Sequence, residues 1–246
     1  MRTQRDTSMK QMPLTIENRW DILYRDFPEI YDEFAAVPKD PEPLQVLMSR
    51  FDFHNKIVAD IGAGSGASAF EFARIAKQVI GVEIEDAMRE LAERERVRRG
   101  VSNIEFRQGD GRKIPLPDNS VDIVTGITLA IYPVEGYRDF AREAARITVN
   151  DGLILMIDIT PGYYGGELVH VIGDESTVDA RQNEILVKEF DFMYEDFDTN
   201  QEYGSLDKIV RTYGFIFGRN AIDHLRENNK TNILWRFRIH YKKIEK

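Results

Sequence analysis

Three glycines in five residues stand where the chain could turn tightly around a bound ligand. Gly62, Gly64 and Gly66 directly follow a short apolar run at 56–61. Glycine lets the backbone turn sharply and approach a ligand closely, because no Cβ intrudes. A turn of this kind between a strand and a helix leaves the first backbone N–H groups of the helix facing the carboxyl edge of the sheet. The glycines therefore predict a nucleotide-type binding turn.

Acidic residues at the ends of apolar runs could complete such a site. Glu83 ends the second run, seventeen residues after Gly66, and Asp60 and Asp110 end the first and third runs. A carboxylate at the end of the second strand can accept hydrogen bonds from both hydroxyls of a ribose. Open α/β sheets bind their ligands at the carboxyl ends of the strands, so the three acids are expected to lie near one ligand.

Taken alone, the glycine turn leaves the identity of the cofactor open. Gly62, Gly64 and Ala67 also satisfy the G-x-G-x-x-[G/A] pattern of NAD-binding domains, and Glu83 stands near the expected offset of about 20 residues. A purely structural turn, an Asp110-Gly111 loop without a ligand and a solvated Glu83 are the plainer interpretations.

The hydrophobic pattern predicts the elements that must position these residues. Strands are expected at 56–61, 79–84, 103–108, 121–127 and 153–159, and helices at 67–77, 86–99 and 136–149. Alternating strands and helices of this length predict a parallel sheet with helices on both faces.

The last third of the chain has a different pattern. We expect a loop or lid at 161–176, a helix at 178–189, a strand at 190–197 and a helical segment at 205–227 with a break near Gly214 or Gly218. At 233–242, apolar and polar residues alternate, which predicts a half-buried strand near a sheet edge.

Composition limits the classes of partner. Acidic residues outnumber basic ones by 42 to 33, giving a formal net charge of −9, which disfavours nucleic acid. The chain has no cysteine, so disulfides and thiolate metal sites are excluded. No apolar run approaches the ~18 residues of a membrane span, and the first 13 residues lack the apolar core of a secretory signal. We therefore expect a cytoplasmic protein with no nucleic-acid or membrane partner.

Four segments together resemble a known family. VADIGAGSG, GVEIEDAM, EFRQGDGRKIPLPDNSVDIV and GLILMID are similar, in order and spacing, to the successive motifs of class I S-adenosylmethionine-dependent methyltransferases. The resemblance spans about residues 56–160 and is closest to the group that methylates small molecules, including quinone-precursor C-methyltransferases. The IPLPDNSVDIV stretch separates this family from NAD-binding folds, which have no reason to carry it.

The resemblance implies roles for individual residues toward S-adenosylmethionine. Asp60 would lie near the amino-acid end of the cofactor, and Glu83 would hold the ribose hydroxyls. Asp110 would accept a hydrogen bond from the adenine amino group. The remaining cofactor contacts implied in this way are Gly62, Ala63, Gly64 and Gly66 in the turn, Ile84 and Gly111 near the adenine, and Gly126 and Ile127 near the methionine.

The sequence indicates much less about the methyl acceptor than about the cofactor. Residues 125–133, TGITLAIYP, lack the Asn/Asp-Pro-Pro-aromatic pattern of enzymes that methylate the amino groups of nucleobases or glutamine amides. Tyr132 and His170 are weak catalytic candidates, with a core aromatic and an exposed loop histidine as the plainer interpretations. The four histidines show no metal-ligand spacing, so no metal is expected. Asp158 and Thr160 face the same edge of the sheet.

The expected protein is thus a methyltransferase with a doubly wound, mostly parallel seven-stranded sheet and an antiparallel C-terminal strand. Residues 1–55 would form a helical cap or lid, and 56–246 the cofactor-binding domain, with a substrate-side insertion at about 160–205. A lid would use the aromatic residues Trp20, Phe27, Tyr31 and Phe34. A non-catalytic S-adenosylmethionine-binding module and an NAD(P)-dependent oxidoreductase remain alternatives, and the oligomeric state stays open, a homodimer included.

Overall fold

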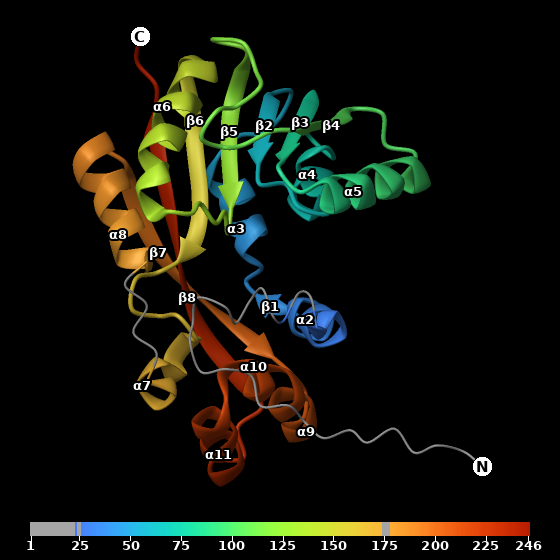
Figure 1. Ribbon diagram of the computed structural model, residues 1–246, viewed down its shortest axis with the longest axis vertical. Helices are drawn as coiled ribbons and strands as arrows, with labels where there is room; N and C mark the ends of the chain where they lie inside the picture. The colour runs from blue at the N-terminus through green and yellow to red at the C-terminus, as the bar shows by residue number, and fades with distance from the viewer. Residues whose placement is uncertain (1–22, 24–25, 174–177) are drawn as a thin grey trace.

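The architecture is one mixed sheet with helices on both faces (Figure 1). The computed structural model describes residue 23 and residues 26–173 and 178–246, so Trp20 lies outside the described residues. The sheet has eight strands in the order β1-β7-β8-β6-β5-β2-β3-β4. Their bounds are β1 Lys39–Asp40, β2 Ile57–Ile61, β3 Gln78–Glu83, β4 Ile104–Gln108, β5 Val121–Ile127, β6 Thr148–Ile159, β7 Met193–Glu202 and β8 Asn232–Lys243.

The parallel half of this sheet confirms the doubly wound fold expected from the sequence. Strands β4, β3, β2, β5 and β6 pair in parallel, and β8 and β7 continue the sheet in antiparallel fashion. The eighth strand, absent from the expectation of seven, is the two-residue β1, which pairs with the end of β7. Because parallel strands all point the same way, the carboxyl ends of β2 to β6 lie at one edge of the sheet. The predicted ligand residues stand at or just after these ends.

Helices cover the two faces of the sheet with separate apolar clusters. On one face, α3 (Pro43–Arg50) and α4 (Ala67–Phe72) contribute Leu47 and Phe72 to the core. On the other face, α6 (Tyr137–Ile147) contributes Phe140, and α8 (Val178–Glu184) with the π-helical turn that follows it (Ile185–Glu189) contributes Leu186. The helix α5 (Asp86–Arg99) lies beside α4 and ends at Gly100, whose φ is +65°. A left-handed glycine at that position terminates a helix, as expected from the sequence.

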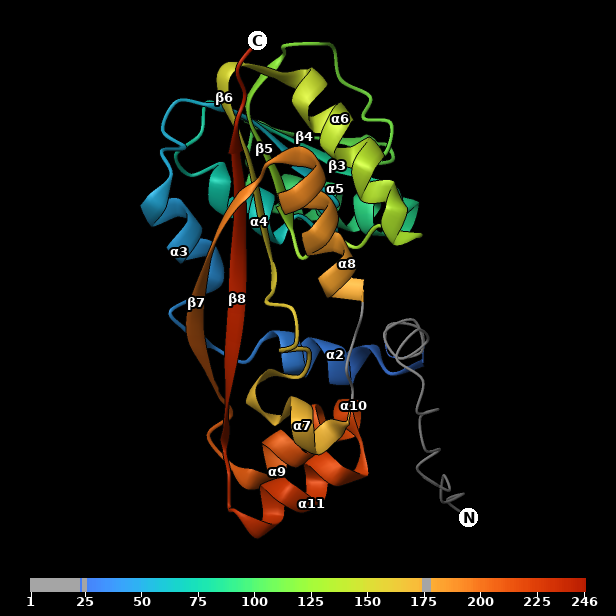
Figure 2. The same cartoon turned by 90° about the vertical axis from the view of Figure 1, so that its left-hand side faces the viewer.

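A second group of helices lies beyond the carboxyl edge of the parallel strands (Figure 2). The strands β7 and β8 run on past β6, which pairs with β8 only as far as Phe237. Around their far ends lie α2 (Pro28–Ala35), α7 (Val169–Ile172), α9 (Leu206–Ile209), α10 (Phe215–Phe217) and α11 (Arg219–Glu227). The break in the last helical segment falls at Gly218, which has φ of +90°.

Aromatic side chains hold this second group together. Trp235 of β8 packs against Tyr213 and Phe217, and the ring of Phe34 from α2 lies 6.3 Å from that of Trp235. The amide of Gln201 joins the strands to α2, because it accepts a hydrogen bond from Trp235 Nε1 (2.8 Å) and donates one to the carbonyl oxygen of Phe34 (3.1 Å).

The structure corrects three expectations about the C-terminal half. First, β8 is an interior strand between β6 and β7, and its polar face is partly buried, with Arg238 only 9% and His240 only 2% exposed. Second, the presumed loop at 161–176 contains α7, and the strand expected at 190–197 runs from 193 to 202. Third, the helix expected at 67–77 ends at Phe72. The first correction has its physical reason in α8, which covers the polar face of β8. Asn183 Oδ1 of this helix accepts a hydrogen bond from Arg238 Nη1 at 2.7 Å.

The expected division into a cap at 1–55 and a cofactor-binding domain at 56–246 stays a prediction. The structure places 206–227 beside α2 and α7, so residues from both parts of that division meet in the second helical group. Within the described residues, none of the helices has the length and apolar character needed to cross a membrane.

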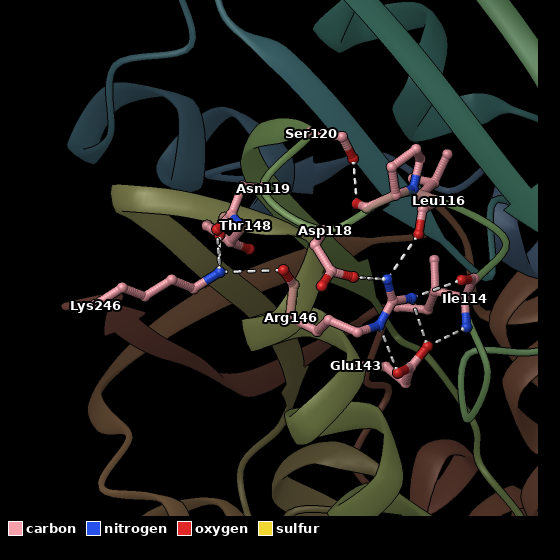
Figure 3. A network of polar contacts seen from close by, with 10 residues as sticks. Ile114, Leu116, Asp118, Asn119, Ser120, Glu143, Arg146, Thr148 and Lys246 are labelled. Carbon is pink, nitrogen blue, oxygen red and sulfur yellow. Dashed lines mark hydrogen bonds and ion pairs between the residues drawn. The ribbon is translucent and has the colours of Figure 1, made fainter.

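The IPLPDNSVDIV stretch is held in place by one arginine of α6 (Figure 3). The guanidinium of Arg146 donates to the carbonyl oxygens of Ile114 (3.0 Å) and Leu116 (2.9 Å). It also pairs with Asp118 (2.7 Å) and, through two nitrogens, with Glu143 (2.8 Å each). Glu143 in turn accepts the backbone N–H of Ile114 at 2.9 Å. This network fixes the loop that leads from β4 into β5.

Replacing this arginine is expected to destabilise the fold. Arg146→Ala removes five hydrogen bonds, among them those to the carbonyl oxygens of Leu116 and Ile114, of which the latter keeps the N–H of Leu116 as a donor. We expect a loss of about 2 kcal/mol in unfolding free energy, since hydrogen bonds to charged groups contribute about 1.5–3 kcal/mol. Thermal unfolding followed by circular dichroism measures it as a fall in Tm of about 4–8 °C.

The matched control lies one turn earlier on the same helix. Arg142 pairs with the exposed Asp139 by an i,i+3 contact and lies 5.8 Å from the centre of the Phe190 ring, and both charged side chains are more than half exposed. Arg142→Ala should therefore change the unfolding free energy by less than about 0.5 kcal/mol. Equal effects of the two substitutions would contradict the role given to Arg146.

Candidate functional site

The glycine turn lies at the carboxyl end of β2, and all three glycines adopt left-handed backbone conformations. Their φ angles are +72° for Gly62, +54° for Gly64 and +88° for Gly66. Such angles favour glycine, because a Cβ would clash with the backbone. At Gly66 a Cβ would also lie 2.8 Å from the ring of Phe106, whereas at Gly64 it would meet only the end of Met88. The turn therefore requires glycine at these positions, and the space beside Gly64, in its middle, is open.

Glu83 joins the end of β3 to this turn. Its side chain is largely buried, with 7% of the residue exposed. One carboxylate oxygen accepts the backbone N–H of Gly64 at 2.7 Å, and the other accepts that of Glu85 at 2.9 Å. A carboxylate oxygen can accept two hydrogen bonds, so each retains capacity for one more donor. Glu83 therefore shapes the turn and can still bind a pair of hydroxyl groups.

Asp60 supports the turn from below. It is 1% exposed, and its two oxygens accept hydrogen bonds from Ser68 Oγ of α4 (2.5 Å) and Thr125 Oγ1 of β5 (2.7 Å). Burial raises the pKa of Asp60 to about 6, partly offset by the Ser68 and Thr125 hydroxyls, while the charge of Glu83 raises it further. Because Asp60 is almost fully buried and each of its oxygens accepts a hydroxyl of the protein, its position makes it an orienting group behind the glycines.

Asp110 follows β4 and is paired with an arginine that sequence reasoning did not single out. Arg112 donates its backbone N–H to Asp110 Oδ1 at 2.8 Å, and its guanidinium donates to Oδ2 at 2.6 and 2.9 Å. These hydrogen bonds hold the pKa of Asp110 below its ordinary value. Nε of Arg112 also approaches Oδ1 at 3.0 Å, but one third of the Asp110 side chain is exposed, so a ligand can reach the carboxylate.

The end of β5 supplies an apolar wall beside the turn. Gly126 is buried and Ile127 partly buried, and both lie next to β6 in the parallel register. Leu129 lies across the turn, because a Cβ on Gly62 would come within 2.6 Å of its side chain. On the opposite side, Ile84 is 53% exposed and Met88 40% exposed. The hydrophobic residues beyond the turn are thus available to contact a ligand.

The candidates for the acceptor side lie farther along the same edge. Tyr132 is 69% exposed between β5 and α6, whereas His170 is exposed on α7 in the second helical group. At the end of β6, Asp158 accepts a hydrogen bond from Gln182 of α8 at 2.6 Å. The buried hydroxyl of Thr160 has no hydrogen-bond partner among the described residues. Within that part of the chain, no three acidic or histidine side chains gather to bind a metal ion.

The structure therefore gathers the glycine turn, Glu83, Ile84, Asp110 with Gly111, and Gly126 with Ile127 at the ends of adjacent strands. It keeps His170 apart from them on α7. Ser68, Thr125, Arg112 and Leu129 were missed from the sequence. Their roles depend on contacts between residues 8 to 67 positions apart, or on a side chain that folds back over its own loop.

These residues fit S-adenosylmethionine on three points. Glu83, whose carboxylate can accept hydrogen bonds from two hydroxyl groups, lies beside the turn. Asp110, an ionised hydrogen-bond acceptor, follows the next strand. The carboxylates of Asp60, Glu83 and Asp110 also give this edge negative charge, which suits a cofactor carrying a cationic sulfur. The turn itself offers backbone close to the ligand without intruding side chains.

Comparison with known proteins supports the same assignment. Residues 59–156 match the family described as "Methyltransferase domain". The chain is 38% identical over 101 residues to "Uncharacterized methyltransferase YcgJ" of Bacillus subtilis, which covers 41% of this chain and 40% of that protein. It is 34% identical over 107 residues to "Ubiquinone/menaquinone biosynthesis C-methyltransferase UbiE" of Pseudomonas putida, covering 42% and 41%. The chain thus spans about two fifths of the length of these relatives.

The fold is shared more widely than the sequence. The crystal structure of YcgJ from Bacillus subtilis superposes with a TM-score of 0.62 at 22% identity, covering 82% of this chain and 98% of that one. A methyltransferase structure from Bacillus halodurans gives 0.59 at 18% identity, covering 83% and 99%. These structures, each under 25% identical to the chain, show a shared fold, and the match to the methyltransferase domain is confined to residues 59–156.

Proposed function

We propose that this chain transfers the methyl group of S-adenosylmethionine to a small-molecule acceptor. The observation that carries the proposal is the placement of the glycine turn, Glu83 and Asp110 at the ends of the neighbouring strands β2, β3 and β4. When bound, the cofactor supplies a methyl group on a positively charged sulfur, which is already activated for in-line displacement.

The residues of the edge divide the binding of the cofactor among them. The turn from Gly62 to Gly66, with Ala63, would hold the methionine and ribose, and Glu83 would accept hydrogen bonds from the ribose hydroxyls. Asp110 would accept a hydrogen bond from the adenine amino group, and Ile84 and Gly111 would lie against the adenine ring. Gly126 and Ile127 bound the methionine side. Asp60, which is buried and accepts hydrogen bonds from Ser68 and Thr125, would orient the turn from behind rather than contact the cofactor.

The chain's contribution to the transfer itself is position and exclusion of water. The acceptor must lie in line with the sulfur–methyl bond, and holding two reactants in this way can supply about 7–11 kcal/mol of the barrier. Ile127 and Ile159, at the ends of β5 and β6, are partly buried hydrophobic residues at this edge. Tyr132 and His170 remain the candidates for contact with the acceptor.

Two observations support a small molecule as the acceptor. The net charge of −9 disfavours nucleic acid, and a relative of 34% identity carries a name for quinone-precursor methylation.

Transfer of a labelled methyl group tests the acceptor class. The protein is incubated with tritiated S-adenosylmethionine and, separately, a panel of phenols, quinols and amines, bulk cell protein, or nucleic acid. We expect label in organic extracts of at least one small-molecule sample. Label found only in protein or nucleic acid would contradict the proposal. Binding of the cofactor without transfer to any sample would favour the non-catalytic module.

A further inference from the structure

One arginine links the loop after β4 to the segment between β5 and α6. Beyond its hydrogen bonds to Asp110, Arg112 donates from Nη1 to the carbonyl oxygen of Tyr132 at 3.1 Å. The same guanidinium thus contacts the carboxylate assigned to adenine and the backbone of the segment 128–136, which leads to the acceptor side. The two segments are about 20 residues apart in the sequence.

The stem of this arginine has a place prepared for it. Gly136 is buried, and a Cβ there would come within 3.0 Å of Arg112 Cδ and 2.8 Å of Ile131. A larger residue at 136 would therefore push the arginine stem away. The backbone carbonyl oxygen of Asp110 also accepts the N–H of Lys113 at 2.9 Å, which closes the loop beneath the guanidinium. Arg112 is thus fixed along its stem and at its head.

We infer that Arg112 is a positioning residue, which turns the Asp110 carboxylate toward the adenine amino group and ties adenine recognition to the placement of segment 128–136. The inference rests on the proposed function, because it assigns Asp110 to the adenine of S-adenosylmethionine. It adds a role for Arg112, and a connection between the cofactor and acceptor sides, that the resemblance to the family does not assign.

The chemistry of the guanidinium suits this role. Arginine presents several N–H donors in a rigid plane, so one side chain can orient a carboxylate and reach a carbonyl oxygen at the same time. Lysine carries the same charge on a single flexible nitrogen and cannot hold both partners in fixed geometry. The pKa of Asp110 is lowered chiefly by the Arg112 side-chain hydrogen bonds, which keeps the carboxylate available as an acceptor.

The ratio of the affinities for two cofactor analogues tests the inference, and this measurement needs no methyl acceptor. S-adenosylhomocysteine carries the exocyclic amino group, whereas S-inosylhomocysteine carries a carbonyl oxygen there, which an ionised Asp110 would repel. Isothermal titration calorimetry gives the ratio of their Kd values for the wild-type protein, Arg112→Ala and Arg112→Lys. We expect the wild-type protein to favour the adenosine compound, and the ratio to fall about tenfold in Arg112→Ala, with little recovery in Arg112→Lys.

The chain offers a matched control at the same spacing. Arg107 pairs with Glu105, two residues earlier, on the exposed β4 edge, just as Arg112 pairs with Asp110. Arg107→Ala should keep the wild-type ratio. Hydrogen exchange gives a second readout, because S-adenosylhomocysteine should protect segment 128–136 in the wild-type protein and lose this effect in Arg112→Ala.

The outcomes separate the inference from the function on which it rests. If the wild-type protein binds neither nucleoside, the proposed function fails. If it binds and discriminates, but Arg112→Ala keeps the same ratio and the same protection of 128–136, the positioning role is wrong. A tighter complex in Arg112→Ala also overturns the inference, since it would show that Arg112 competes with adenine for Asp110.

Discussion

Glu83→Gln should raise the Kd for S-adenosylmethionine about a hundredfold while leaving the protein folded. The carboxylate of Glu83 accepts two backbone N–H groups and has one further acceptor position on each oxygen. Glutamine keeps only one oxygen, so it cannot serve both the turn and two ribose hydroxyls. Hydrogen bonds to charged groups contribute about 1.5–3 kcal/mol, and each 1.4 kcal/mol changes Kd tenfold. Calorimetric titration of the folded variant measures the change.

The neighbouring residue provides the control for this substitution. Glu85 is exposed, and only its backbone N–H takes part in the turn. Glu85→Gln removes the same charge from nearly the same place and should leave Kd within about twofold of the wild-type value. If both variants bind like the wild-type protein, Glu83 does not contact the ribose.

Asp60→Asn should become more stable relative to the wild-type protein as the pH rises from about 4 to 6. Burial raises the pKa of Asp60 from 3.8 to about 6, so the folded chain holds a proton that the unfolded chain has lost within this window. Ionisation therefore costs the wild-type protein stability as pH increases, and the cost is constant above about pH 6. A difference of about two pKa units corresponds to about 3 kcal/mol.

Chemical denaturation at several pH values measures this difference. At pH 4 the carboxyl group is neutral and the two proteins differ only by an oxygen replaced by nitrogen. At pH 8 the Asn variant lacks the buried charge. Thr125→Val, which removes the hydroxyl that donates to Asp60 Oδ1, should steepen the same pH dependence. A stability difference that does not change between pH 4 and 8 would show that folding does not raise the pKa of Asp60.

The sequence predicted the parallel half of the fold well because local and global signals agree there. The runs that became β2, β3 and β5 are apolar and short, and each is bounded by glycine or polar residues. The helix α5 was placed to the residue, since Asp86 begins it and the left-handed Gly100 ends it. Similarly, the glycine turn was recognisable because three glycines with positive φ cannot readily be replaced.

The antiparallel half was harder to predict because its environment comes from distant segments. The alternation at 233–242 indicated an edge strand, yet Arg238 and His240 are buried beneath α8, whose Asn183 Oδ1 lies within hydrogen-bond distance of both side chains. Nothing local in the sequence signals that pairing. The two-residue β1 and the short helices around Tyr213 likewise depend on packing against β7 and β8 rather than on their own patterns.

The candidate site shows the same limit. Positions that carry a backbone requirement or a strand-end carboxylate were found, whereas the partners that orient them were not. Thr125 lies 65 residues from Asp60 and is brought beside it only by the pairing of β2 with β5. Arg112 is two residues from Asp110, but its second contact, with Tyr132, depends on the loop that follows β5.

Parallel calorimetric titrations of the full chain with S-adenosylmethionine, S-adenosylhomocysteine and NAD test the central claim most directly. The arrangement of Glu83, Asp110 and the glycine turn predicts micromolar binding of the first two ligands and no heat from NAD. Binding of NAD alone would contradict the assignment, since it would show that the turn at 62–66 serves a dinucleotide.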